Sequence, residues 1–131
     1  MPRKKARTDV LTPTELRLME ILWRNGSATV ADVHGALPDG DMAYASVSTM
    51  MRVLEQKGHV RHDTDGRVFV YHPLVGPDVA RRRAVTDVLS RYFGGSAAQM
   101  TANLLEGGDV SRSDLSEMKR LLAEAERGAH R

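Results

Sequence analysis

Residue patterns along the chain predict a mainly α-helical fold with one small β-hairpin. Residues 43–58 show the apolar spacing of an amphipathic helix, and two short alternating runs, 59–63 and 67–72, follow it directly. Two more helical patterns precede it, and each has a start signal. The order helix, helix, turn, helix, hairpin within about 60 residues is that of a winged helix-turn-helix domain. A helical tail follows, and we expect it to be a dimerisation domain.

The first helix is predicted to begin at Thr12. Thr12 is a natural N-cap, Pro13 suits the first helical position, and Glu15 is spaced to close a capping box. Leu11 and Leu16 have the spacing of a hydrophobic staple. The apolar residues expected to face the core are Leu16, Met19, Leu22 and Trp23.

The second helix follows Gly26, which is a natural C-terminal stop for the first. Thr29 is placed to cap the second helix, and Asp32 is placed to reach back to that cap. The turn residues at 38–40 then end the helix. The residues expected to face inward are Val30, Val33 and Leu37.

The third helix carries two contrasting faces. Apolar residues at i, i+3, i+4 and i+7 predict a buried face of Val47, Met50, Met51 and Leu54. The opposite stripe combines short side chains with one arginine, and it consists of Ala45, Ser48, Thr49, Arg52 and Gln56. Small polar side chains let a helix approach base edges closely, so this face could lie in a DNA major groove. Ala43 stands at the N-cap without a capping side chain, a role that a DNA phosphate could take.

The alternating runs after this helix predict a hairpin whose turn residues are Thr64, Asp65 and Gly66. Basic residues around the tip would place the hairpin on DNA phosphates as a wing. We therefore expect Lys57 and Arg67 to join the DNA-binding residues. The plainer alternative is an ordinary surface helix followed by a hairpin.

The tail begins after a joint of proline and glycine residues. We predict a flexible basic arm at 1–10, a winged helix domain at 11–76 and a helical dimerisation domain at 77–131. The short helices of the tail have apolar stripes but little combined core, so a two-fold dimer is expected. The residues expected at the dimer interface are Val88, Leu89, Tyr92, Leu115, Met118, Leu121 and Leu122.

Composition narrows the classes of function. The absence of cysteine excludes disulfides and thiolate metal sites. The N-terminus has no apolar core for a secretory signal, and the apolar run at 68–71 is far too short to span a membrane, so we expect a cytoplasmic protein without membrane insertion. A net charge of +2 is weak evidence for nucleic acid. Residues 1–8, however, contain only basic charges, and this arm would either solubilise the chain or contact phosphates.

Several segments together resemble the penicillinase repressor family, the bacterial regulators of the BlaI and MecI type. The segments are LTPTELRLMEILWRNG, ATVADVHGAL, MAYASVSTMMRVLEQKGHV, GRVFVYHPL and MTANLLEGGDVSRSDLSEMKRLL, within residues 11–125. The resemblance implies a homodimeric transcriptional repressor that binds an inverted-repeat, palindromic operator in double-stranded DNA. By the same resemblance, the recognition face falls on Ala45, Ser46, Ser48, Thr49 and Arg52.

The resemblance also implies a route of induction. Repressors of this family can be inactivated by proteolysis, triggered by a membrane sensor that detects a β-lactam, so a sensor-linked protease would be a partner. The cleavage point falls on Asn103 and Leu104, where leucine stands in place of the phenylalanine of the family's Asn-Phe pair. The copper-responsive branch of the family has C-terminal cysteines, which this chain lacks.

The chain has five histidines, which are common metal ligands, but their placement argues against a metal site. His59 and His62 fall on opposite faces of a strand, whereas a metal needs three or four converging ligands. We expect surface or wing histidines, no metal, no cofactor and no catalytic residues.

Two alternatives to this repressor remain. A winged helix used only for protein interaction would show exposed leucines or aromatic residues in place of Ser48, Thr49 and Arg52. A repressor released by a small-molecule ligand would need an apolar cavity. The residues that could line it, or pack in the core or the dimer instead, are Tyr44, Tyr92 and Phe93.

Overall fold

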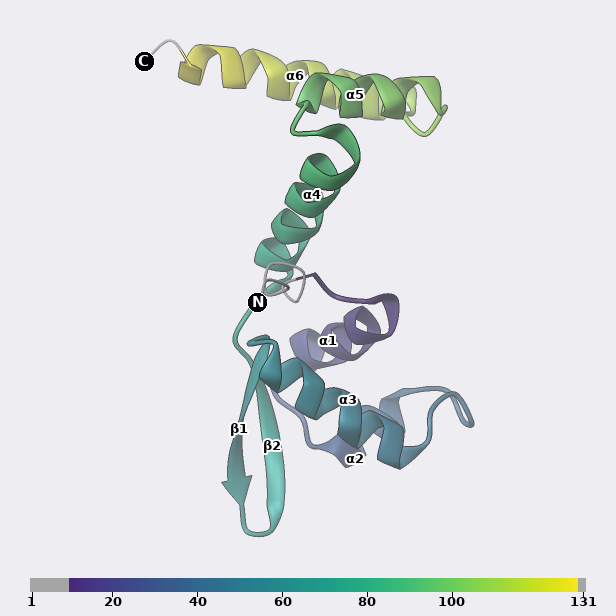
Figure 1. Ribbon diagram of the computed structural model, residues 1–131, viewed down its shortest axis with the longest axis vertical. Helices are drawn as coiled ribbons and strands as arrows, with labels where there is room; N and C mark the ends of the chain where they lie inside the picture. The colour runs from purple at the N-terminus through teal and green to yellow at the C-terminus, as the bar shows by residue number, and fades with distance from the viewer. Residues whose placement is uncertain (1–9, 130–131) are drawn as a thin grey trace. The chain divides into compact units, whose positions relative to one another are not determined.

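The computed structural model describes residues 10–129 and shows a mainly helical chain with one two-stranded antiparallel sheet (Figure 1). The predicted fold class is confirmed. The elements are α1 (Pro13–Asn25), α2 (Val30–Ala36), α3 (Tyr44–Gln56), β1 (Val60–Asp65), β2 (Val68–Pro73), α4 (Pro77–Phe93), α5 (Ala97–Glu106) and α6 (Arg112–Ala129). Residues 1–9 of the predicted basic arm, and His130, lie outside the described residues.

The chain divides into two compact units within α4: the first ends at Asp87 and the second begins at Val88. The first unit therefore holds α1 to β2 together with the first turns of α4. The sequence places the domain boundary earlier, at the joint before α4. Each unit is described separately below.

Both predicted capping boxes are present, and they set the starts of α1 and α2. The Thr12 amide donates to Glu15 Oε1 at 2.9 Å, and the Glu15 amide donates back to Thr12 Oγ1 at 3.1 Å. Thr29 and Asp32 repeat the arrangement at 3.1 and 3.0 Å. Each box satisfies amides that a helix start leaves without an intrahelical partner.

The first unit has one hydrophobic core, to which every element from α1 to β2 contributes. Its buried residues are Leu18, Met19, Ile21, Leu22, Ala28, Val33, Leu37, Val47, Met51, Leu54, Val60 and Tyr71. The predicted inward face of α2 is confirmed, since Val33 and Leu37 are buried and Val30 packs partly against the core.

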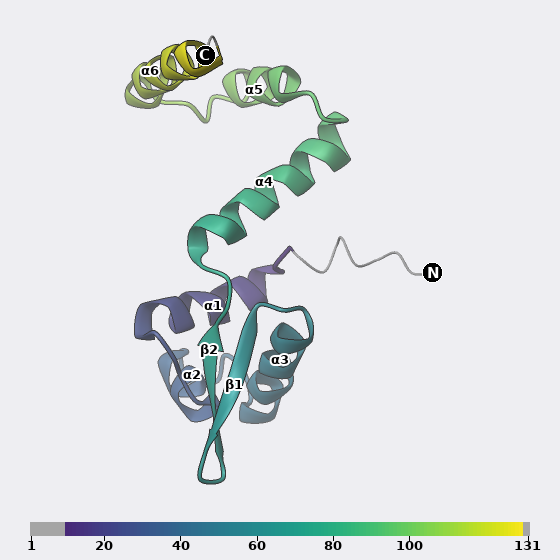
Figure 2. The same cartoon turned by 90° about the vertical axis from the view of Figure 1, so that its left-hand side faces the viewer.

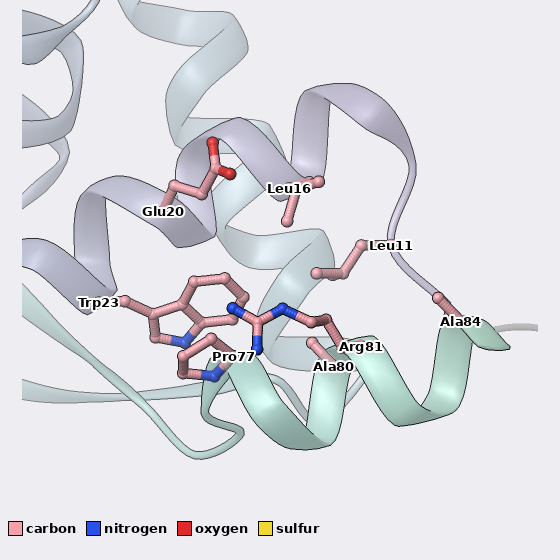
Figure 3. Close-up of a pocket in the computed structure, with 8 residues that line it drawn as sticks. All are labelled: Leu11, Leu16, Glu20, Trp23, Pro77, Ala80, Arg81 and Ala84. Atoms are coloured by element: carbon pink, nitrogen blue, oxygen red, sulfur yellow. The ribbon is translucent and has the colours of Figure 1, made fainter. Parts of the chain in front are cut away.

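The prediction of a buried Leu16 is wrong, because its side chain is 39% exposed. The inward face of α1 is centred on Leu18 and Leu22, and helical spacing turns Leu16 away from that face. Together with Leu11 and Trp23, Leu16 lines a hollow of about 330 Å³ that faces the first turns of α4 (Figure 3). Trp23 is partly buried at this edge, and its indole Nε1 donates to the Val75 carbonyl at 2.8 Å.

The hairpin has a tighter turn than the sequence predicts. β1 and β2 pair as far as Asp65 opposite Val68, so Thr64 and Asp65 belong to the strand and not to the turn. Gly66 and Arg67 alone form the loop. Gly66 has φ +67°, and no non-glycine residue among those described has a positive φ. A positive φ at the first loop residue only is that of a type II′ turn, whose twist matches that of the strands.

The base of the hairpin is held by the connection between α1 and α2. Ala28 and Tyr71 exchange two backbone hydrogen bonds, at 3.0 and 2.8 Å. The tip of the hairpin projects beyond the helices of this unit in both views (Figures 1 and 2). A winged helix arrangement results, with the wing fixed at its base and open at its tip.

A buried ion pair connects α1 to the end of α3. Lys57 Nζ donates to Glu15 Oε1 at 2.7 Å and to the Val10 carbonyl at 3.4 Å. Glu15 is only 3% exposed. Burial by itself would raise the pKa of Glu15, but hydrogen bonds from Lys57 and Thr12, together with the charge of Lys57, hold that pKa below its ordinary value.

The second unit consists of the end of α4 with α5 and α6, and these helices contain no fully buried residue. Gly94 and Gly95, with φ of 55° and 89°, end α4 in a backbone conformation that suits glycine. Ser96 caps α5 through the Gln99 amide at 3.0 Å, and Ser111 caps the start of α6 at the same distance. Within residues 10–129, no helix combines the length and apolar composition needed to cross a bilayer.

Candidate nucleic-acid interface

The two predicted faces of α3 are present. Val47, Met51 and Leu54 are fully buried, and Met50 packs partly against the core. The residues on the other side reach solvent: Ala45, Ser46, Thr49, Arg52 and Gln56 are exposed, and Ser48 is half-buried. Burial of the apolar stripe therefore orients α3 so that its polar stripe faces outward.

The polar stripe of α3 and the wing share one groove, which we call the α3–wing groove. It has a volume of about 400 Å³ and is lined by Thr29, Val30, Ala31, Tyr44, Ser48, Arg52, Arg67, Val68, Phe69 and Tyr71. The groove brings together three of the predicted DNA-binding residues, Ser48, Arg52 and Arg67. Ala45, Ser46 and Thr49 do not line it and are exposed elsewhere on α3.

Two arginines give the α3–wing groove its charge. Arg52 and Arg67 are exposed, and neither forms an ion pair with any residue that the structure describes. Arg61, by contrast, pairs with Asp63 on the same hairpin at 2.9 Å. Guanidinium groups without an internal carboxylate partner can bind phosphate or the acceptors of guanine.

Lys57 is placed differently from the other predicted contact residues. Its side chain is 17% exposed and its ammonium pairs with Glu15 on the inner side of α1. It does not line the α3–wing groove. We therefore assign Lys57 to the stability of the first unit and omit it from the proposed DNA contacts.

Tyr44 is a groove residue that the sequence interpretation missed. That interpretation places it in a core, a dimer contact or a ligand cavity, whereas the side chain is 53% exposed and lines the α3–wing groove. A signal was present in the sequence, because Tyr44 lies four and eight residues before Ser48 and Arg52 on the same face of the helix.

The side chain of His62 connects the two strands of the wing with α3. The His62 ring stacks on Phe69, with centroids 4.0 Å apart and planes inclined by 15°. His62 Nδ1 lies 2.8 Å from both carboxylate oxygens of Glu55 on α3. His62 thus contacts both Phe69 on the other strand of the wing and Glu55 on α3.

The expectation of surface histidines is wrong for His59. This residue is fully buried just before β1, where its backbone amide donates to the Leu54 carbonyl at 3.0 Å. Among residues 10–129, no group of three or more histidines and carboxylates is placed to hold a metal ion.

The start of α3 is open, as predicted. Ala43 is the N-cap and makes no side-chain hydrogen bond to the helix. The first-turn amides of α3 thus receive no side-chain cap from Ala43, whereas α1 and α2 are capped by threonine. Amides left in this way can donate hydrogen bonds to a phosphate oxygen.

Comparison with known proteins gives a consistent assignment. Residues 11–124 match the family described as penicillinase repressor. The penicillinase repressor of Bacillus licheniformis is 27% identical over 115 residues, which cover 87% of this chain and 90% of that protein. The transcriptional regulator BlaI of Mycobacterium tuberculosis is 32% identical over 117 residues, which cover 87% of this chain and 83% of that protein.

Two solved structures resemble parts of this chain. The solution structure of the DNA binding domain of the repressor BlaI is 29% identical, with a TM-score of 0.47 over 51% of this chain and 83% of that one. An ArsR-like transcriptional regulator from Rhodococcus sp. RHA1 shares the fold at 16% identity, with a TM-score of 0.50 over 77% of this chain and 91% of that one. On the family match, this chain belongs to the penicillinase repressor family and is a DNA-binding transcriptional repressor of the BlaI type, not an enzyme.

Proposed function

We propose that the chain acts in the cytoplasm as a homodimer that represses transcription by binding a palindromic operator. In this proposal α3 lies in the major groove of each half-site, and the wing lies on the adjacent phosphates. The observation that carries it is the α3–wing groove, where Ser48 and Arg52 of α3 meet Arg67 of the wing. Base-reading and phosphate-binding groups would then contact one stretch of duplex.

Exposed apolar side chains support the homodimer. In the second unit the large exposed residues are Tyr92, Leu104, Leu105, Leu115, Leu121 and Leu122. Burying one such side chain fully contributes about 1.5–3 kcal/mol, so a helical unit that exposes several of them is stabilised by pairing with a second copy. Of the other predicted interface residues, Val88, Leu89 and Met118 are half-buried within the chain.

Thr49 tests whether α3 reads bases. We expect Thr49→Ala to weaken binding to the operator by about 1–3 kcal/mol and to leave binding to random DNA nearly unchanged. The side chain is exposed and contributes nothing to the core, so folding should be unaffected. Gel-shift titrations on operator and random duplexes measure the difference. Equal losses on both duplexes would show that Thr49 only positions the backbone.

Arg67 tests the role of the wing. Because it lies at the hairpin tip, we expect Arg67→Ala to weaken binding to all DNA alike and to reduce the salt slope of binding by about one. Titrations across a salt series give that slope. Arg61→Ala is a matched control on the same hairpin, since Arg61 already pairs with Asp63. A sequence-selective loss for Arg67→Ala would contradict the proposed wing contact.

Proteolysis at Asn103-Leu104 is the proposed route of release, by a protease linked to a β-lactam sensor. The bond lies inside α5, where the Asn103 carbonyl accepts a hydrogen bond from the Gly107 amide at 3.1 Å and Leu104 is 41% exposed. α5 has no fully buried residue, so local opening costs little and would expose the bond. Cutting there would separate α6 from the rest of the chain.

Immunoblots of cells treated with a β-lactam test this route. We expect the full-length band to disappear as the target gene is derepressed. Leu104→Phe restores the family's Asn-Phe pair and should be cut faster than the native chain. A full-length band that persists through derepression, in both forms, would exclude cleavage as the switch.

A further inference from the structure

Tyr44 is an exposed aromatic residue at the first position of α3, and the core of the first unit does not use its ring. The side chain is 53% exposed, whereas Tyr71, the other tyrosine of the α3–wing groove, is 2% exposed. Tyr44 continues the polar stripe of α3 by one turn, since Ser48 and Arg52 follow at i+4 and i+8. The ring therefore belongs to the same surface as the proposed base contacts.

The Tyr44 ring is held in place by α2. The half-buried His34 of that helix contacts it edge to face, with centroids 5.6 Å apart and planes inclined by 68°. Such a contact favours one orientation of an otherwise exposed ring. A ring that is already oriented loses less conformational entropy when it binds a partner.

The position and chemistry of the ring indicate what it contacts. The N-terminal residues of a recognition helix are those that reach base edges in helix-turn-helix complexes. The apolar group that a base pair presents in the major groove is the C5-methyl of thymine. We propose that Tyr44 is a specificity-determining residue that packs its ring on the methyl group of one thymine in each operator half-site. The inference rests on the proposed function, because it requires α3 to lie in the major groove.

Replacing single thymines by deoxyuridine tests the contact, because the exchange removes only the methyl group. The operator is first selected from random duplexes by the native protein, and each thymine is then replaced in turn. We expect the native protein to lose about three- to tenfold in affinity at one thymine per half-site. Tyr44→Ala should lose a similar factor on the unmodified operator and show no further loss with deoxyuridine at that position.

Further variants separate the ring from its surroundings. Tyr44→Phe keeps the ring and should retain the deoxyuridine pattern of the native protein. His34→Ala removes the bracing contact and should reduce the discrimination between thymine and deoxyuridine without abolishing it. Leu74→Ala shortens another exposed side chain of the first unit, 57% exposed and outside the groove, and should behave as the native protein does.

Two results would overturn the inference while leaving the proposed function intact. One is a Tyr44→Ala variant that keeps the native sensitivity to deoxyuridine. The other is a Tyr44→Phe variant that loses affinity for all DNA equally, because this would assign the hydroxyl to a phosphate contact. If the native protein selects no sequence from the random duplexes, the proposed function and the inference both fail.

Discussion

Replacing Leu121 with Asp is expected to dissociate the homodimer and to weaken operator binding by about 10²–10⁴-fold, through loss of the effective concentration of a linked pair. Leu121 is 50% exposed within one chain, so the carboxylate does not disturb the fold of a monomer. In the proposed dimer the same position is covered, and an unpaired charge buried there would oppose association. Sedimentation and gel-shift titration measure the two effects.

Ser116→Asp is the matched control for this experiment. Ser116 is exposed on the side of α6 away from Leu115, Met118 and Leu122, so the same charge should leave both the dimer and its affinity unchanged. An unaltered dimer for Leu121→Asp would contradict the proposed interface. A dimer lost equally in both variants would indicate damage to α6 itself.

Replacing Lys57 with Met is expected to lower the free energy of unfolding by about 3 kcal/mol at neutral pH, because it leaves the charge of Glu15 buried without its ion partner. Methionine retains the length of the side chain, so the effect reports on charge more than on packing. Arg61→Met is the matched control, since Arg61 and Asp63 are both exposed and such a surface pair contributes at most about 1 kcal/mol. Urea denaturation measures both variants.

The effect of Lys57→Met should depend on pH in a defined direction. The folded pKa of Glu15 lies below its ordinary value of 4.5, so the native protein has the full stabilisation above about pH 4.5 and loses it as the pH falls through the folded pKa. The difference between native and variant proteins should therefore shrink in acid. A difference that stays constant from pH 7 to below the folded pKa of Glu15 would show that the ion pair is not its source.

Local signals in the sequence are sufficient for the helix starts and for the faces of α3. The capping boxes of Thr12 with Glu15 and Thr29 with Asp32 join residues three positions apart, so their geometry follows once a helix forms. The burial of Val47 and Leu54 opposite Arg52 follows from helical periodicity alone. The fold class and the polar stripe of α3 are predictable for this reason.

The turn of the hairpin and the position of Leu16 are not predictable in the same way. Thr64 and Asp65 are typical turn residues, yet pairing with β2 draws both into the strand. Leu16 has helical spacing with Met19, but the side on which α2 and α3 pack leaves it exposed. In both cases tertiary contacts override a weak local preference.

The amino-acid sequence by itself therefore determined the fold class, the helix starts, the buried face of α3 and most of the residues proposed to contact DNA. Only the tertiary structure decided that Lys57 pairs with Glu15, 42 positions away, and that Tyr44 shares a groove with Arg67 of the wing. The physical reason is the range of the interactions. Caps and periodic faces depend on residues within a few positions of one another, whereas the partner of a charge or a ring depends on which distant elements the core brings together.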